Sequence, residues 1–466
     1  MTEAGPWTIE VDALSVFVGP HRLLGPISFR VGAADVLVVM GETGAGKSLL
    51  AQAILGALPT GLHAEGRIVL NGRRVDDRPP RARAALWGRQ LAMLPQEPWR
   101  ALDPLMRSDR QVAETHRFVA GRAWPDAQAA ARDDFCRLGL DGAGHRLPGA
   151  LSGGMAQRVA FAAATAGGAP ILIADEPTKG LDADRSATVV ELLGKVAREG
   201  GTLLAITHDV AVARRLRGET IILKEGALVE RGPSATVLHR PSDPYTQALL
   251  AAEPGNWADP RRVAHGPVLL EAEDLAITRS GRKLFGGFNL TLRAGERISI
   301  TGPSGVGKTS LLDALAGLLR PSAGAIRREP SIGPTGIQKL YQDPPAAFPA
   351  RVTLGQSLRD VAKLHAVAWS VVSDLLARLD IHASLLDRYP DSVSGGELQR
   401  IAIARALTVA PAILLADEPT SRLDPITQCE TMSLIAEIAV ERRIGVVLVT
   451  HDLAIASNWA EQLVRL

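Results

Sequence analysis

The sequence is poor in cysteine and in long apolar runs, and each shortage excludes a class of protein. Its two cysteines, Cys136 and Cys429, supply neither a disulfide framework nor a metal-ligand spacing. Apolar runs such as Gly445–Val449 are far shorter than the roughly 20 residues of a transmembrane helix. The first residues lack a basic start followed by an apolar stretch, so no signal peptide is expected. We therefore expect a cytoplasmic protein with reduced thiols, which partners must dock if it works at a membrane.

The sequence also lacks an excess of charge of either sign. Its 466 residues include 52 basic and 50 acidic ones, which gives a formal net charge of +2. This balance provides no overall basic footprint for nucleic acid. The content of hydrophobic residues (46%) and of charged residues (22%) is typical of a globular protein, and the length suggests two or three domains.

The chain contains an internal repeat, because one ordered set of five segments occurs twice. In order, the paired segments are GETGAGKS (41–48) and GPSGVGKT (302–309), LPQEP (94–98) and LYQDP (340–344), LSGGMAQRVAFA (151–162) and VSGGELQRIAIA (393–404), ILIADEPTKGLD (171–182) and ILLADEPTSRLD (413–424), and AITHDVAVA (205–213) and LVTHDLAIA (448–456). We predict a first domain over 1–239, a linker rich in Pro, Ala and Gly with one short helix over 240–267, and a second domain over 268–466.

The hydrophobic pattern predicts an α/β fold for each copy. Short apolar runs precede each GxxxxGK[ST] loop, each DEP segment and each THD segment. Runs of this length are typical of strands buried on both faces of a parallel sheet, and helical patterns alternate with them. We therefore expect two tandem α/β domains, each built around a parallel sheet.

Two loops fit the pattern G-x-x-x-x-G-K-[ST], and each lies between a predicted strand and a predicted helix. Their glycines allow successive backbone N–H groups to point at phosphate oxygens, the lysine reaches the β- and γ-phosphates, and the hydroxyl ligates Mg²⁺. The loops consist of Gly41, Glu42, Thr43, Gly44, Ala45, Gly46, Lys47 and Ser48, and of Gly302, Pro303, Ser304, Gly305, Val306, Gly307, Lys308 and Thr309.

Four further polar positions repeat at the ends of predicted strands or soon after them. Most adjacent Asp-Glu pairs are solvated surface charge and most lone histidines are structural, so the interpretation depends on the repeat. The aspartates are candidate Mg²⁺ ligands, the glutamates candidate bases for the attacking water, the histidines candidate γ-phosphate contacts, and the glutamines candidate contacts of Mg²⁺ or water. These residues are Asp175, Glu176, His208 and Gln96 in the first copy, and Asp417, Glu418, His451 and Gln342 in the second.

An SGG segment precedes a helical stretch in each copy, as Ser152, Gly153 and Gly154 and as Ser394, Gly395 and Gly396. A serine followed by small residues is typical of a helix N-cap, and a capped helix start with bare N–H groups also binds phosphate. Each copy then has two phosphate-binding ends, one more than a single ATP needs. We therefore expect the SGG segment of one copy to close over the nucleotide of the other.

With these motifs in this order, nearly the whole chain resembles an ATP-binding cassette (ABC) protein with two nucleotide-binding domains. The resemblance implies P-loop NTPase cassettes, each a RecA-like parallel-sheet core with an antiparallel β subdomain and a helical subdomain. It makes 97–150 and 343–392 the helical parts that dock on membrane subunits, and places Asp182 and Asp424 in the D-loops. It also implies two ATP- and Mg²⁺-dependent sites, the first with Lys47, Gln96, Glu176, His208 and the SGG of the second copy, and the other with Lys308, Gln342, Glu418, His451 and the SGG of the first.

In this family an aromatic side chain from a strand upstream of the phosphate loop usually stacks on adenine. Phe17 fits that place in the first copy, although it would equally suit the core. The matching stretch of the second copy offers Arg279, whose planar guanidinium also stacks on rings.

Two segments resemble the peptide and nickel importer subfamily: EPWRALDPLMR (97–107) and RPSDPYTQALLAAEP (240–254). This resemblance implies an ATPase at the cytoplasmic face of a bacterial inner membrane, working with two integral-membrane permeases and a periplasmic solute-binding protein. The solute would be a peptide, nickel, a metal chelate or an opine-like compound.

The alternative is a soluble tandem ABC ATPase that acts on ribosomes or nucleic acid. Translation-factor members separate their cassettes by a long, charged helical linker, whereas this linker is short and Pro-rich. DNA-repair members insert zinc modules, which two lone cysteines cannot supply.

Overall fold

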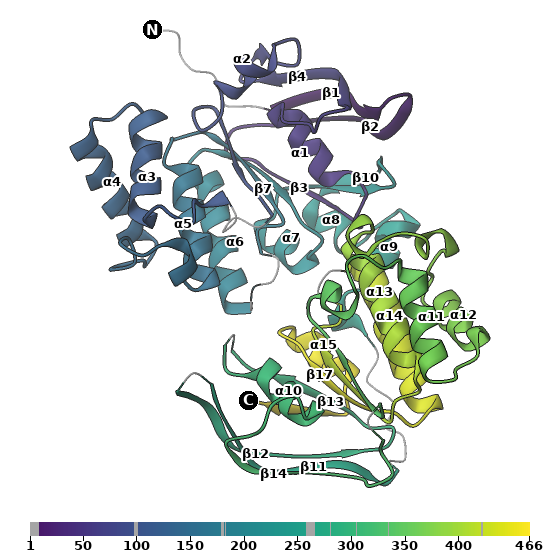
Figure 1. Cartoon of the computed structure of the whole chain (residues 1–466). Helices are drawn as coiled ribbons and strands as arrows, with labels where there is room; N and C mark the ends of the chain where they lie inside the picture. The colour runs from purple at the N-terminus through teal and green to yellow at the C-terminus, as the bar shows by residue number, and fades with distance from the viewer. Residues whose placement is uncertain are drawn as a thin grey trace. The chain divides into compact units, whose positions relative to one another are not determined.

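The computed structural model of the chain describes residues 9–96, 101–178, 181, 183–257, 266–279, 281–303, 305–333, 335–420 and 423–466. The chain divides into two compact units, Met1–Leu250 and Ala251–Leu466. Figure 1 colours the first from purple to teal and the second from teal to yellow. The finer division into 1–239, 240–267 and 268–466 stays a prediction.

A mostly parallel sheet forms the centre of the first unit, in the order β10-β9-β3-β8-β7-β6. All neighbours pair in parallel except β10, which is antiparallel to β9. Every residue of β7 and β8 is buried, as the continuous apolar runs predict. The strands are β3 (Val36–Gly41), β6 (Leu91–Leu94), β7 (Ile171–Asp175), β8 (Thr202–Ile206), β9 (Glu219–Lys224) and β10 (Ala227–Pro233).

An antiparallel sheet in the order β2-β1-β4-β5 completes the β structure of the first unit. Helix α1 (Lys47–Leu55) packs against β1 of this sheet and against β3 and β7 of the central one, as Figure 1 shows. Its Leu50 and Ile54 are buried in the core that the two sheets share. The antiparallel strands are β1 (Ile9–Val18), β2 (His21–Val31), β4 (Leu62–Leu70) and β5 (Arg73–Arg74).

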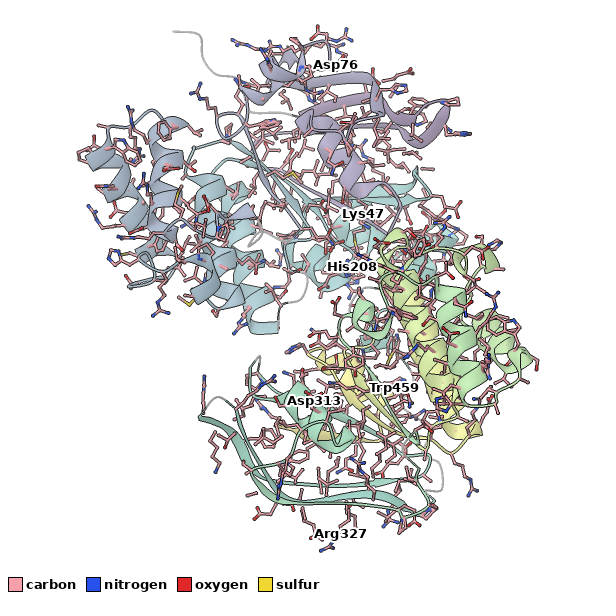
Figure 2. All side chains as sticks on the ribbon, viewed as in Figure 1. Lys47, Asp76, His208, Asp313, Arg327 and Trp459 are labelled. Atoms are coloured by element: carbon pink, nitrogen blue, oxygen red, sulfur yellow. The ribbon has the colours of Figure 1, made fainter. Side chains whose placement is uncertain are left out.

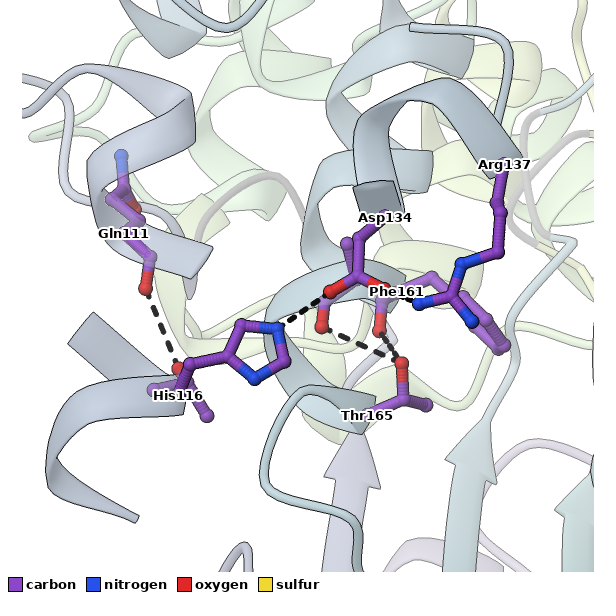
Figure 3. A network of polar contacts seen from close by, with 8 residues as sticks. Gln111, His116, Asp134, Arg137, Phe161 and Thr165 are labelled. Carbon is purple, nitrogen blue, oxygen red and sulfur yellow. Dashed lines mark hydrogen bonds and ion pairs between the residues drawn. The ribbon is translucent and has the colours of Figure 1, made fainter. Parts of the chain in front are cut away.

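Helices α3 and α4 of the first unit pack against each other, and polar contacts hold them together. His116 of α3 is 5% exposed, and its Nε2 lies 2.7 Å from Oδ2 of Asp134 in α4 (Figure 3). Arg137 contacts the same carboxylate, and nearby Thr165 donates to the Phe161 carbonyl at 2.8 Å. The helices of this unit after α1 are α2 (Pro80–Ala84), α3 (Ser108–Phe118), α4 (Trp124–Arg137), α5 (Gly153–Thr165), α6 (Ala183–Arg198), α7 (Val210–Leu216), α8 (Ser234–Val237) and α9 (Pro244–Ala251).

The second unit repeats this design. Its central sheet is wholly parallel, in the order β15-β16-β17-β13-β18, and its antiparallel sheet has the order β12-β11-β14. The strands are β11 (Val268–Arg279), β12 (Arg282–Arg293), β13 (Arg297–Thr301), β14 (Ala323–Arg328), β15 (Ile337–Leu340), β16 (Ile413–Asp417), β17 (Gly445–Val449) and β18 (Gln462–Arg465). The helices are α10 (Lys308–Ala316), α11 (Leu354–Leu364), α12 (Trp369–Arg378), α13 (Gly395–Thr408), α14 (Pro425–Glu441) and α15 (Leu453–Trp459).

The two central sheets have the same topology. The order β9-β3-β8-β7-β6 of the first unit corresponds strand by strand to β18-β13-β17-β16-β15 of the second. In both, the carboxyl ends of the three middle strands meet at one sheet edge, where α/β proteins bind ligands. The tandem α/β fold is therefore confirmed. Among the described helices, none combines the length and apolarity needed to span a membrane.

Candidate functional site

The loop 41–48 of the first unit connects β3 to α1 and has the backbone of a phosphate loop. Gly41 and Gly46 have φ values of 146° and 89°, which side-chain-bearing residues rarely adopt. A Cβ on Gly41 would also lie 2.0 Å from the Leu223 carbonyl oxygen. Lys47 is 8% exposed, and its ammonium donates to the carbonyls of Gly41 and Glu42, both at 2.8 Å. Figure 2 labels Lys47 at this loop.

The loop of the second unit, 302–309, has the same geometry between β13 and α10. Gly302 and Gly307 have φ values of 156° and 113°. The Lys308 ammonium donates to the carbonyls of Gly302 at 2.8 Å and Pro303 at 3.0 Å. Ser304, a predicted loop residue, lies outside the described residues. The two loops therefore hold their lysines in the same way.

The Asp-Glu pair of the first cassette lies at the carboxyl end of β7. Asp175 ends the strand, and the next residue, Glu176, has a φ of 48° although it carries a side chain. Its N–H donates to the Ile206 carbonyl at 2.9 Å, which ties it to the end of β8. Nδ1 of His208, also labelled in Figure 2, lies 2.8 Å from Oε1 of Glu176. The predicted base and histidine are thus in direct contact.

The second cassette repeats this arrangement, with a glutamine in contact with the glutamate as well. Glu418 also has a φ of 48°, and its N–H donates to the Val449 carbonyl at 2.9 Å. Nε2 of His451 lies 2.8 Å from Oε1 of Glu418. The Gln342 amide donates to the other carboxylate oxygen, Oε2, at 2.9 Å. In the first cassette the corresponding Gln96 is exposed, next to residues outside the described part of the chain.

Asp417 lies beside the phosphate loop of the second cassette in a buried position. Burial raises the pKa of Asp417 above its ordinary value, although a hydrogen bond with Thr309 and the charge of Lys339 act in the opposite direction. The contact joins the predicted carboxylate and hydroxyl ligands of Mg²⁺. Such hard oxygen ligands suit this ion.

The SGG segments begin helices, as predicted. The Ser152 hydroxyl accepts from the Met155 N–H at 3.4 Å at the start of α5. The Ser394 hydroxyl accepts from the Glu397 N–H at 3.2 Å at the start of α13, and the Glu397 carboxylate accepts from the Ser394 N–H at 2.7 Å. Gly153, Gly154, Gly395 and Gly396 are the first residues of these helices. The expected closure of each segment over the nucleotide of the other copy stays a prediction.

The D-loop aspartates and the adenine contacts also remain predictions. Asp424 caps α14 by accepting from the Thr427 N–H at 3.1 Å, whereas Asp182 lies outside the described residues. Phe17, on β1, is half-buried, and its ring stacks on His63 with centroids 5.4 Å apart. The exposed Arg279 donates to the Ser310 hydroxyl at 3.4 Å, near the phosphate loop.

Sequence reasoning missed a charged pair beside the second site. The Lys339 ammonium lies 2.5 Å from Oδ1 of Asp313, and the Lys339 side chain is only 6% exposed. The signal was a lysine within the strand IQKL, where the first copy has Met93 in LAML. A buried ammonium needs a partner of opposite charge, although the local pattern does not identify it.

Comparisons with known proteins agree with this description. The model of the ABC transporter family matches residues 24–179 and 285–421. The peptidoglycan transport ATP-binding protein YejF of Agrobacterium fabrum is 32% identical over 94% of this chain and 86% of its own length. The glutathione import ATP-binding protein GsiA of Salmonella paratyphi A is 30% identical over 94% of this chain and 80% of its own.

A solved structure of RNase-L Inhibitor has a TM-score of 0.66 and 20% identity, and the match covers 93% of this chain and 84% of that one. At this identity the likeness shows the fold alone. The family model matches both units and the relatives match over most of the chain, so these comparisons show the family as well as the fold. The chain belongs to the ABC transporter family, as an ATP-binding ATPase coupled to transport in which two cassettes are fused.

Proposed function

We propose that this chain is the ATP-hydrolysing subunit of an importer for small peptide-bearing solutes. The observation that carries the proposal is the match over 94% of the chain to a relative named for peptidoglycan transport, together with relatives named for glutathione import. Both names denote compounds that contain peptide units. Nickel and metal chelates, which the subfamily resemblance also allows, have no such support among these relatives.

In this proposal, both cassettes hydrolyse ATP. The loops 41–48 and 302–309 bind the phosphates through backbone N–H groups and through Lys47 and Lys308. Glu176 and Glu418 act as bases toward the attacking water. Support comes from the contact of each glutamate with His208 or His451, which orients the carboxylate at the sheet edge beside the phosphate loop.

Mg²⁺ would be held by oxygen ligands on the same edge. We propose Ser48, Gln96 and Asp175 in the first cassette, and Thr309, Gln342 and Asp417 in the second. The ion supplies positive charge that offsets the charge on the phosphates. The hydrogen bond between Thr309 and Asp417 supports the fit, because it brings two of these ligands together.

The partners in this proposal are two integral-membrane permeases and a periplasmic solute-binding protein. The test uses the double variant Glu176→Gln, Glu418→Gln, which should bind ATP without hydrolysing it. The variant is expressed with a tag in its native host and crosslinked in the presence of ATP, and the copurifying proteins are identified by mass spectrometry. We expect two permeases, and the copurified binding protein is then titrated with peptides, glutathione and nickel.

The matched control is the variant Lys47→Ala, Lys308→Ala, which should not bind ATP and should therefore lose ATP-dependent partners. Ribosomes or nucleic acid with no membrane protein would overturn the importer proposal in favour of a soluble ABC factor. A binding protein that takes nickel and no peptide would leave the importer but overturn the solute class.

A further inference from the structure

The segment after the last strand of the first unit reaches back to its phosphate loop. Tyr245, the second residue of α9, is 9% exposed, and its hydroxyl oxygen accepts a hydrogen bond from the Glu42 N–H at 2.8 Å. The two residues are 203 positions apart in the chain. The Lys224 ammonium, at the end of β9, lies 5.3 Å from the centroid of the Tyr245 ring. The phenol is therefore fixed between the central sheet and the loop.

This segment is itself anchored to the sheet. The Glu230 carboxylate on β10 accepts from the N–H and hydroxyl of Ser242, both at 2.8 Å, and from the Asp243 N–H at 3.3 Å. Burial acts to raise the pKa of Glu230, but these hydrogen bonds and one from Thr246 outweigh it and hold the pKa below its ordinary value. Asp243 in turn accepts from the Tyr245 N–H at 2.8 Å. Tyr245 thus has a rigid support.

The peptide group that Tyr245 contacts also accepts a hydrogen bond from Lys47, which contacts the Glu42 carbonyl as well. Its N–H belongs to Glu42 and its C=O to Gly41, and that carbonyl accepts from the Lys47 ammonium at 2.8 Å. One planar peptide group is therefore held by the phenol on its donor side and by the lysine on its acceptor side. Rotation of this peptide would move the carbonyl that Lys47 contacts.

The second cassette restrains the corresponding peptide in a different way. Lys308 donates to the Gly302 carbonyl at 2.8 Å, but the next residue is Pro303, which has no N–H to hold. The preceding glycines have similar φ values, 146° at Gly41 and 156° at Gly302. The ring of Pro303 restricts the backbone that a hydrogen bond restrains in the first cassette.

We infer that Tyr245 is a positioning residue for ATP at the first cassette: through the Gly41–Glu42 peptide it holds the loop in the conformation that presents Lys47 to the phosphates. Pro303 fulfils this role in the second cassette. The inference rests on the proposed role of the loop 41–48 in phosphate binding. It gives the segment around 240–251 a function at the nucleotide site, in addition to its contacts with the sheet.

The test measures the Kd of MgATP by calorimetry in the full chain carrying Lys308→Ala, so that binding reports the first cassette. Loss of one neutral hydrogen bond corresponds to about a 3- to 10-fold change, so Tyr245→Phe should raise the Kd by about that factor. Glu42→Pro removes the N–H and should make the Kd insensitive to Tyr245→Phe. Glu42→Ala retains the N–H and is the matched control, in which Tyr245→Phe should keep its full effect.

An equal effect of Tyr245→Phe in all three backgrounds would overturn the inference, because the phenol would then act only on the packing of α9. No effect in any background would overturn it as well. If Glu42→Pro does not fold, hydrogen exchange at the Glu42 amide decides, since Tyr245→Phe should accelerate it and an unchanged rate contradicts the inference. Lys47→Ala separates the two proposals: if it leaves MgATP binding intact, the phosphate-loop assignment fails rather than the role of Tyr245.

Discussion

The two cassettes have the same backbone at the residues proposed for catalysis and phosphate binding, but different side chains around them. Both glutamates have a φ of 48°, both contact a histidine at 2.8 Å, and both lysines bond to the first loop carbonyl at 2.8 Å. Around them, Glu42 of the first cassette corresponds to Pro303, and Met93 to Lys339. The same loop geometry is thus supported by a hydrogen bond in one copy and by a proline ring in the other.

Replacing both proposed bases should have the largest effect, because both cassettes are proposed to hydrolyse ATP. General-base catalysis contributes about 10²- to 10⁴-fold, so Glu176→Gln with Glu418→Gln should reduce ATP turnover by about that factor. Each single variant should also lower the steady-state rate of phosphate release. Retained MgATP binding is the control. Full activity of Glu418→Gln beside an inactive Glu176→Gln would show that only the first cassette turns over.

The charged pair of the second cassette gives the next largest effect, on stability. Lys339→Met leaves Asp313 without this buried ammonium, and we expect a loss of about 2–3 kcal/mol in the free energy of unfolding. Lys339→Met with Asp313→Gln installs the residues of the first cassette, Met93 and Gln52, and should lose about 1 kcal/mol or less. Denaturant unfolding of the full chain, followed by a probe in the second unit, measures both. A double variant less stable than the single one would contradict this account.

The helix caps of the SGG segments should differ by a smaller amount. The Ser394 cap is reciprocal, because Glu397 bonds back at 2.7 Å, whereas Ser152 accepts one long bond of 3.4 Å. Ser394→Ala should therefore cost about 1 kcal/mol in the free energy of unfolding, and Ser152→Ala about half as much. Glu397→Met copies Met155 of the first cassette and should make the two serine variants equal. Unequal losses that persist in this background would point to another cause.

The fold could be predicted largely from local patterns. The continuous apolar runs at Ile171–Asp175 and Ile413–Asp417 give buried parallel strands, and the glycine-lysine loops between strand and helix give the edge at which the sites lie. The repeat then predicts that both units share this topology. These features depend on residues that are close in sequence, where spacing and composition carry the information.

The contacts beside each site that join residues far apart in the sequence could not be predicted in this way. Lys339 and Asp313 are 26 residues apart, and Glu42 and Tyr245 are 203 apart. Such pairs depend on how remote segments pack, which single-sequence periodicity does not report. The choice between the two ring nitrogens, Nδ1 of His208 and Nε2 of His451, is equally invisible in the sequence, because the same THD triplet precedes both helices.

The left-handed backbone at Glu176 and Glu418 has a consequence for how such proteins change over generations. A side-chain-bearing residue in this backbone region raises the conformational energy by about 1–3 kcal/mol. Glycine adopts the region without this cost, and asparagine adopts it at a lower cost. Replacing either glutamate by glycine would therefore relieve the backbone while removing the proposed base. Where selection for transport relaxes, such a substitution would end hydrolysis and also stabilise the folded state. A duplicated cassette is thus free to lose chemistry in one half while its architecture becomes more stable.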